Sequence, residues 1–180
     1  MAPPRLVLDT NVCLDLFVFG DAACAALRAA LDAGAVEAVA DAACRDEWLA
    51  VLAYPQLALD VARREAAMAA FDMRLRLLSP LSRYKPGAGD FGASTHESLD
   101  SCLRRNDGAT PKLPRCADPD DQKFLELAQA GGAQWLLSRD KALLKLAKRT
   151  RRDHGFDIVT PQAWSRAYAG LAGASSAKPV

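Results

Sequence analysis

The stretch RLVLDTNVCLDLF, residues 5–17, decides how the chain begins to fold. Residues 5–8, in which three apolar residues follow Arg5, predict a short buried strand. The run ends on Asp9, and residues 11–18 then predict a helix with Thr10 or Asn11 near its N-cap. A buried strand that ends on a carboxylate has two explanations: Asp9 starts the helix, or it holds a positively charged group.

The rest of the chain alternates strand patterns with helix patterns. The further strands are expected at 36–39, 133–138 and 156–159, and the helices at 21–33, 42–53, 57–78, 118–132, 141–149 and from Pro161 onward. Such alternation predicts the α/β class, with a mostly parallel sheet covered by helices on both faces.

One long segment interrupts this alternation. Residues 79–117 are rich in Pro, Gly and Ser, and a loop of this length inside a compact domain is typically functional or disordered. We predict one domain over residues 1–168, with 79–117 as an inserted, partly mobile loop and 169–180 as a flexible tail. A chain of 180 residues with 51% hydrophobic residues is long and apolar enough for one folded core.

Composition also restricts where the protein works. The five cysteines are odd in number and have no C-x-x-C spacing, which favours buried thiols in a reducing compartment. MAPPR at residues 1–5 is followed by an apolar run of strand length, which is too short for a signal peptide, and no apolar run approaches the length of a membrane span. These features predict a cytoplasmic protein with no membrane partner.

Several acids fall where a parallel sheet binds ligands, at the carboxyl ends of its strands. Asp9 follows the first strand, Asp140 follows the strand at 133–138, and Asp121 begins a helix. Each acid alone has a structural explanation. Asp140, Asp118 or Asp121 can serve only as a helix cap, and Glu47 can be a solvated surface charge.

Taken together, the acids point to a metal ion. Clustered carboxylates repel one another, and a divalent cation removes that repulsion. Ligands that are all oxygen atoms suit Mg²⁺ or Mn²⁺ rather than zinc, and the two histidines, His96 and His154, have no ligand-like partner spacing. An acidic site for Mg²⁺ or Mn²⁺ at a strand edge suits the hydrolysis of phosphate esters.

Four motifs, taken in order, resemble the PIN-domain family of nucleases. They are LDTN at 8–11, DEWLAVL at 46–52, DPDDQKFLELA at 118–128, and LLSRD at 136–140, followed by a closing strand and Thr-Pro at 160–161. The resemblance covers roughly residues 5–165 apart from the insertion. It is strongest to the toxin branch of the family, which is related to the VapC-type toxins of toxin–antitoxin systems.

The resemblance implies a PIN-like three-layer α/β/α sandwich and metal-dependent cleavage of single-stranded RNA. Carried over onto this sequence, the catalytic and metal-binding acids would be Asp9, Glu47, Asp121 and Asp140. Asn11 and Ser138 match small polar positions that support the site, and Asp118 would be an accessory ligand or the alternative to Asp121. The resemblance also implies a cognate antitoxin protein that covers the active groove, and a homodimer.

A local cluster of basic residues favours a polyanionic partner, although the formal net charge of the chain is only +1. Residues 139–154 contain seven basic residues against two acidic ones. We predict that the cluster forms a phosphate track for RNA, and the alternative is a solvated helix face. The residues expected to contact the RNA backbone are Arg139, Lys141, Lys145, Lys148 and Arg149.

Two other functions fit parts of the sequence. A phosphatase of the haloacid-dehalogenase type also has an Asp after its first strand, but it needs a second Asp two residues later, where this chain has Asn11. A non-catalytic module that binds RNA or a partner protein would need none of the acids, although all four are present.

Overall fold

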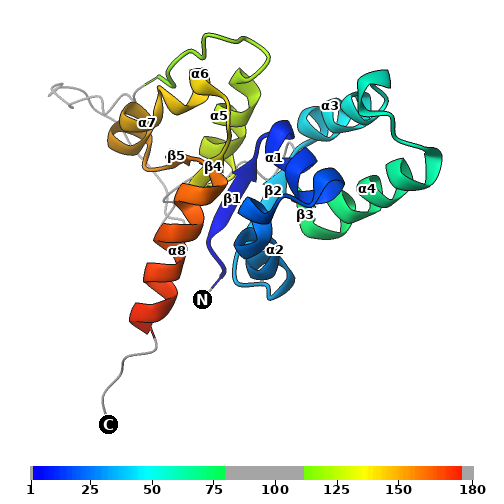
Figure 1. Cartoon of the computed structure of the whole chain (residues 1–180). Helices are drawn as coiled ribbons and strands as arrows, with labels where there is room; N and C mark the ends of the chain where they lie inside the picture. Colours follow the sequence, from blue (N-terminus) through cyan, green and yellow to red (C-terminus); the bar gives the residue numbers. More distant parts are fainter. Residues whose placement is uncertain (1, 80–111, 176–180) are drawn as a thin grey trace, which may run out of the picture.

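The computed structural model describes residues 2–79 and 112–175, which form an α/β fold around a five-stranded sheet (Figure 1). Every strand pair is parallel, in the order β3-β2-β1-β4-β5, so the predicted parallel sheet is confirmed. The strands are β1 (Arg5–Leu8), β2 (Glu37–Ala40), β3 (Leu75–Leu77), β4 (Trp135–Leu137) and β5 (Asp157–Val159).

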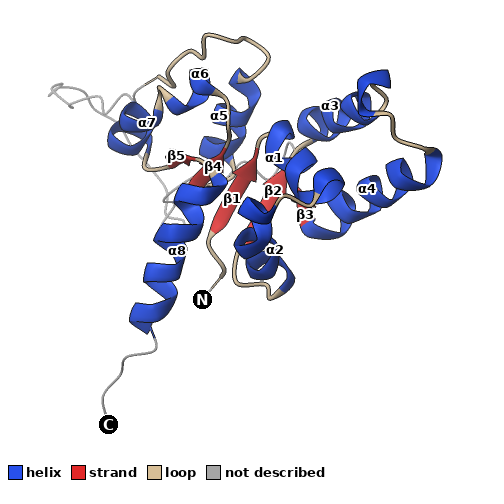
Figure 2. Cartoon of the chain, in the orientation of Figure 1, coloured by secondary structure: helices blue, strands red, loops and turns tan. Residues whose placement is uncertain are grey.

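Helices flank this sheet, as the colouring in Figure 2 shows. They are α1 (Thr10–Leu14), η1 (Asp15–Phe19), η2 (Ala22–Cys24), α2 (Ala25–Asp32), α3 (Ala42–Leu52), η3 (Pro55–Leu57), α4 (Val61–Arg74), α5 (Gln122–Ala130), α6 (Lys141–Leu144), α7 (Ala147–His154) and α8 (Pro161–Ser175). Helices α2 and α8 contact each other, whereas α5 packs on β1 and β4. The strand order reverses direction between β3 and β4, and right-handed connections, the rule for parallel strands, then lie on opposite faces of the sheet before and after the reversal. The chain is therefore the predicted helix–sheet–helix sandwich.

Both faces of the central strands are buried, which explains why those strands are apolar at consecutive positions. Leu6 and Val7 of β1 and Leu136 and Leu137 of β4 are fully inaccessible to solvent. Ser138, which follows β4, is buried to the same degree. The first residues after β1 and β4 therefore follow directly on strands that are buried in the core, and this burial restricts the positions of their side chains.

The predicted helix at 57–78 is wrong at both ends. The Asp60 side chain accepts a hydrogen bond from the Arg63 backbone N–H (2.7 Å) and starts α4 at Val61. At the other end, Leu75–Leu77 pairs with β2 as strand β3. Apolar residues spaced by three or four fit a helix, but here pairing with a neighbouring strand decided the conformation, which local spacing cannot reveal.

Three other boundaries differ from the prediction. Helix α5 begins at Gln122, so the preceding Asp-Pro-Asp-Asp forms turns instead of a first helical turn. The helix expected at 141–149 is divided into α6 and α7. Helix α1 begins at Thr10, with Asp9 at its N-cap position, one residue earlier than expected.

The ends of the predicted insertion and tail are partly described. Residues 80–111, which form most of the insertion, lie outside the described residues. Gln122 of α5 accepts a hydrogen bond from the Cys116 backbone N–H (2.9 Å), so the end of the segment docks on α5. Helix α8 continues to Ser175, past the start of the predicted tail at 169.

Two further expectations concern helices and cysteines. Among the described helices, none combines the length and the apolar character needed to span a membrane. Cys13, Cys24 and Cys44 are buried free thiols, as small apolar residues in a reduced core would be.

The strand order identifies where a ligand would bind. The chain runs from β1 to β2 and β3 on one side and then returns to β4 on the other side of β1. In an open parallel sheet, the crevice outside the carboxyl ends of two strands at such a reversal is the usual binding position. Here that position lies between the end of β1, which is followed by Asp9, and the end of β4, which is followed by Ser138.

Candidate active site

Asp9 and the segment Ser138–Asp140 meet at the reversal between β1 and β4. The Asp9 backbone N–H donates to the Leu137 carbonyl oxygen (3.0 Å), which extends the pairing of the two strands by one residue. Asp9 as a residue is only 3% exposed. Strand pairing therefore fixes the position of Asp9 before any of its own side-chain contacts are considered.

Two neighbouring side chains hold the Asp9 carboxylate. Ser138 Oγ donates to Asp9 Oδ2 at 2.5 Å, and Asn11 Nδ2 donates to the same oxygen at 2.6 Å. Burial raises the pKa of Asp9, and these hydrogen bonds partly oppose that effect. The predicted supporting residues Asn11 and Ser138 are therefore both placed against Asp9, and their side chains both donate to its Oδ2.

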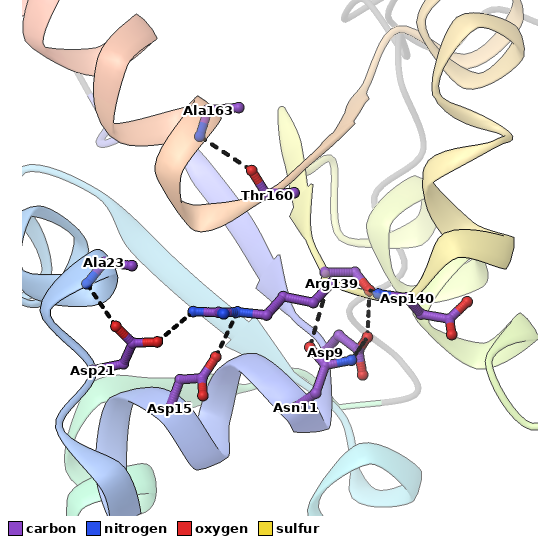
Figure 3. Close-up of polar contacts among 10 residues, drawn as sticks. Asp9, Asn11, Asp15, Asp21, Ala23, Arg139, Asp140, Thr160 and Ala163 are labelled. Atoms are coloured by element: carbon purple, nitrogen blue, oxygen red, sulfur yellow. Dashed lines mark hydrogen bonds and ion pairs between the residues drawn. The ribbon is translucent and has the colours of Figure 1, made fainter.

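Asp140 is the N-cap of α6, which is the structural alternative that the sequence analysis gave for this acid. Its Oδ1 accepts hydrogen bonds from the backbone N–H groups of Ala142 (2.6 Å) and Leu143 (3.2 Å). Its own backbone N–H donates to Ser138 Oγ at 2.9 Å. The carboxylate is directed at the first turn of α6 (Figure 3), while the residue as a whole is tied to the Asp9 network through Ser138.

Glu47 reaches the same edge from α3, which packs against α1 and α5. Thr10 Oγ1 donates to Glu47 Oε1 at 2.7 Å. Lys123 of α5 forms an ion pair with the other carboxylate oxygen, Oε2. Glu47 is therefore not a freely solvated surface charge, because both of its oxygens are engaged by neighbours in the fold.

Asp121 connects the acids electrostatically. Its pKa is raised to about 6, first by burial and then by the negative charges of Asp9, Asp118, Asp140 and Glu47. No side-chain hydrogen bond caps α5 at this residue. The accumulated negative charge is therefore only partly compensated at Asp121, which is the situation that a divalent cation relieves.

Asp118 is the weaker of the two candidates for the third acid. Its Oδ1 accepts a hydrogen bond from the Asp120 backbone N–H at 2.9 Å, as in a turn that an Asp side chain closes. The side chain is exposed, whereas Asp121 is half-buried beside the other acids. The geometry therefore favours Asp121 as the third member of the cluster and leaves Asp118 at its margin.

The donor set fits a hard divalent cation in chemistry, although its members are not arranged as ligands. Across residues 2–79 and 112–175, no three His, Cys, Asp or Glu side chains are positioned to hold one ion. Asp140 is turned toward α6, and Glu47 is paired with Lys123. The oxygen ligands that Mg²⁺ and Mn²⁺ prefer are present, and side-chain rotations would be needed to bring them together.

The basic residues divide into two groups. Lys141, Lys145, Lys148 and Arg149 are exposed on and beside α6 and α7. Arg139 differs, because its guanidinium forms ion pairs with Asp15 (2.7 Å) and Asp21 (2.6 Å). The four other basic residues lie on the exposed surface of this region, whereas Arg139, although also exposed, is paired with two carboxylates of the chain.

Sequence reasoning missed the residues that hold the acids in place. Thr10 was treated only as a possible cap, yet it positions Glu47. Lys123 follows Asp121 by two residues, and this charged neighbour within the acidic motif was the available signal. Asp15 and Asp21 gave no local signal, because their partner Arg139 lies more than a hundred residues away.

We predict that Asp121→Asn stabilises the metal-free protein at neutral pH. The pKa of Asp121 is raised from the usual 3.8 to about 6. The contribution of this carboxyl group to the free energy of unfolding is therefore fully present below pH 3.8, and it is lost as the pH rises through 6 and the group ionises. Asn keeps the uncharged state at every pH. Because Asp121 is partly solvated, we expect a gain of only about 1 kcal/mol at pH 7.5 and none below pH 4.

Urea unfolding in EDTA at several pH values measures this gain. The control is Asp118→Asn, which removes an exposed acid and should change the unfolding free energy by less than about 0.5 kcal/mol. If Asp121→Asn were less stable than the wild type at pH 7.5, the conclusion that the negative charge of Asp121 is poorly compensated in the metal-free protein would be wrong.

Comparison with known proteins identifies the family. A family model described as PIN domain matches residues 5–142, a range that includes all four predicted acids. No curated protein sequence matches the chain. PIN domains are generally nucleases and typically use divalent metals, which agrees with the acids gathered at the strand ends. Because the match covers well over half of the sequence, this protein belongs to the PIN-domain family.

Proposed function

We propose that this protein is a divalent-metal-dependent endoribonuclease that cleaves single-stranded RNA. Membership of the PIN-domain family supports a nuclease in general. The observation that carries the finer proposal is the environment of Asp121, whose pKa is raised first by burial and then by the negative charges of four other acids nearby. Such a concentration of carboxylates at the reversal of a parallel sheet suits a cation and a phosphodiester better than a neutral ligand.

The residues proposed to hold Mg²⁺ or Mn²⁺ are Asp9, Glu47, Asp121 and Asp140. When bound, such an ion supplies positive charge to the phosphodiester oxygens and makes water a stronger nucleophile. The protein contributes the positions of the acids. Asn11 and Ser138 fix Asp9, and Thr10 fixes Glu47. Residues that orient ligands in this way commonly change metal affinity or activity about 10- to 100-fold when they are removed.

The exposed cluster on α6 and α7 is the proposed contact for the RNA backbone. Lys141, Lys145, Lys148 and Arg149 are solvent-exposed, and Asp140, one of the proposed metal ligands, is the N-cap of α6. Lysine and arginine contacts to phosphate position a nucleic acid without reading its sequence. An RNA strand held on this surface would therefore be led to the acids.

We also propose a biological role and partners. The resemblance to PIN-family toxins supports a toxin that a cognate antitoxin protein restrains by covering the active groove, and it supports a homodimer. Both proposals follow from family resemblance. Copurification tests whether an antitoxin protein binds, and light scattering of the purified protein measures whether it is a dimer.

One observation favours a second candidate, a non-catalytic module that binds RNA or a partner protein. In the described residues the Asp140 carboxylate caps a helix and Glu47 is neutralised by Lys123, so both acids have structural roles without a metal. The haloacid-dehalogenase type of phosphatase gains no such support, because Asn11 donates its amide to Asp9 where that chemistry needs a carboxylic acid.

We predict that Asp9→Asn abolishes cleavage and leaves RNA binding intact. Asn keeps the size of Asp9 and an oxygen for Ser138 and Asn11, but it loses the charge that a cation needs. We expect a loss of on the order of 100-fold or more in the rate of cleavage of a mixed RNA pool with Mn²⁺. EDTA should abolish cleavage by the wild type.

The matched control is Asp60→Asn, which changes another N-cap carboxylate to the amide at the start of α4. Asn caps helices as well as Asp does, so this variant should cleave normally. If the wild type bound RNA but showed no cleavage under any metal condition, the non-catalytic module would become the better description.

We predict that the lysines on α6 and α7 bind phosphate. Replacing Lys145 or Lys148 with Gln should weaken RNA binding equally for unrelated sequences. Each replacement should also reduce the slope of log K against log salt by roughly 0.7, the value for one contact to a single strand. Arg63→Gln, an exposed change on α4, serves as the control and should leave the slope unchanged. Fluorescence anisotropy at several salt concentrations measures the slope, and unchanged slopes for both lysine variants would exclude this surface.

A further inference from the structure

Arg139 occupies an unusual position between two residues of the site. It follows Ser138, which donates to Asp9, and precedes Asp140, which caps α6. Its side chain turns away from α6 and α7 and crosses toward the first helical segment, where it meets Asp15 and Asp21 (Figure 3). The Arg139 guanidinium is partly exposed, at 37% of the side chain, and two carboxylates lie within 2.7 Å of it. Its environment is therefore set by these acids as well as by solvent.

The two acids that receive Arg139 belong to one compact turn. Asp15 begins η1, a π-helical turn that continues directly from α1, and Asp21 caps η2 through the Ala23 backbone N–H (2.8 Å). The Asp21 backbone N–H also donates to the Asp15 carbonyl oxygen at 2.9 Å. The guanidinium therefore joins the loop after β4 to both ends of the turn that follows α1.

The backbone of Arg139 makes a second connection to the same helical segment. Its N–H donates to Asn11 Oδ1 at 3.3 Å, and Asn11 in turn donates to Asp9 Oδ2. Ser138 donates to the same Asp9 oxygen and accepts from the Asp140 N–H. The orientation of Asp9 therefore depends on how the loop after β4 sits relative to α1, and the Arg139 side chain spans that junction.

We propose that Arg139 is a positioning residue that holds the loop after β4 against the α1–η1 segment and thereby sets the orientation of Asp9 and Asp140. This role replaces the RNA contact that the sequence predicted for Arg139, and it rests on the proposed nuclease function. A planar guanidinium can bind two carboxylates in different directions at once, whereas the lysine ammonium is a single point charge. Lysine should therefore substitute only in part.

The test compares Arg139→Gln, Arg139→Lys and Asp21→Asn with the wild type. Asp21→Asn weakens the ion pair from the other side, and its amide oxygen can still cap Ala23. For each protein we would measure Mn²⁺ affinity by calorimetry, kcat and KM on single-stranded RNA with Mn²⁺, and the salt dependence of RNA binding. Thermal unfolding shows whether each variant is folded, and Asp21→Asn keeps the test decisive if Arg139→Gln does not fold.

The expected result separates positioning from RNA contact. Arg139→Gln should weaken Mn²⁺ binding and lower kcat, each about 10-fold or more, while KM changes less than about twofold and the salt slope stays the same. Arg139→Lys should recover part of both losses. Because Arg139→Gln and Asp21→Asn break the same contact, the double variant should lose much less than the product of the two single losses.

Two outcomes would overturn the proposal while the nuclease function stands. In one, Arg139→Gln raises KM and lowers the salt slope by roughly 0.7 with Mn²⁺ affinity unchanged, which would make Arg139 an RNA contact. In the other, Arg139→Gln cleaves RNA and binds Mn²⁺ as well as the wild type does, which would leave Arg139 without a positioning role. A wild-type protein that neither binds Mn²⁺ nor cleaves RNA would instead remove the proposed function, and the role of Arg139 with it.

Discussion

The burial of the Asp9 carboxylate is the constraint on which the rest of the site depends. A carboxylate that is 3% exposed at the end of a central strand loses most of its hydration, and such a loss is costly unless neighbouring groups replace the water. Ser138 and Asn11 supply two hydrogen bonds to one of its oxygens. The pKa of Asp9 is nevertheless raised, so these two bonds do not fully replace the lost hydration. A nearby positive charge would complete the compensation.

The sheet topology makes this arrangement possible. Asp9 and Ser138 are 129 residues apart in the sequence, and they meet because the chain returns to place β4 beside β1. Each strand fixes the first residue after it, since backbone pairing continues from Asp9 to Leu137. Parallel strands thus bring separate segments to one edge, and the side chains that follow the strands, rather than the strands themselves, determine the chemistry there.

The sequence predicted the parts of this site that follow from local pattern. The apolar run before Asp9 predicted β1, and the order of acidic motifs brought Asp121 and Glu47 into consideration. Strand β3 was missed because Leu75 continues the helical spacing of Phe71 and Leu78, and only pairing with β2 shows that it belongs to a strand. The ion pairs of Lys123 with Glu47 and of Arg139 with Asp15 and Asp21 were missed for a related reason. A charged residue read alone does not reveal whether its partner is solvent, RNA or a distant carboxylate.

The structural and functional explanations for the acids are compatible for some residues and compete for others. A carboxylate has two oxygens with about four acceptor sites. In the described residues, Asp140 accepts its capping hydrogen bonds from the backbone N–H groups of Ala142 and Leu143 on Oδ1, and Asp9 accepts those from the Ser138 and Asn11 side chains on Oδ2. These contacts therefore leave the second oxygen of each acid unused. Glu47 differs, because Thr10 engages one oxygen and Lys123 the other. A cation that reached Glu47 would have to displace the Lys123 ammonium, and the strength of that ion pair therefore sets how readily Glu47 could join the other acids around a metal ion.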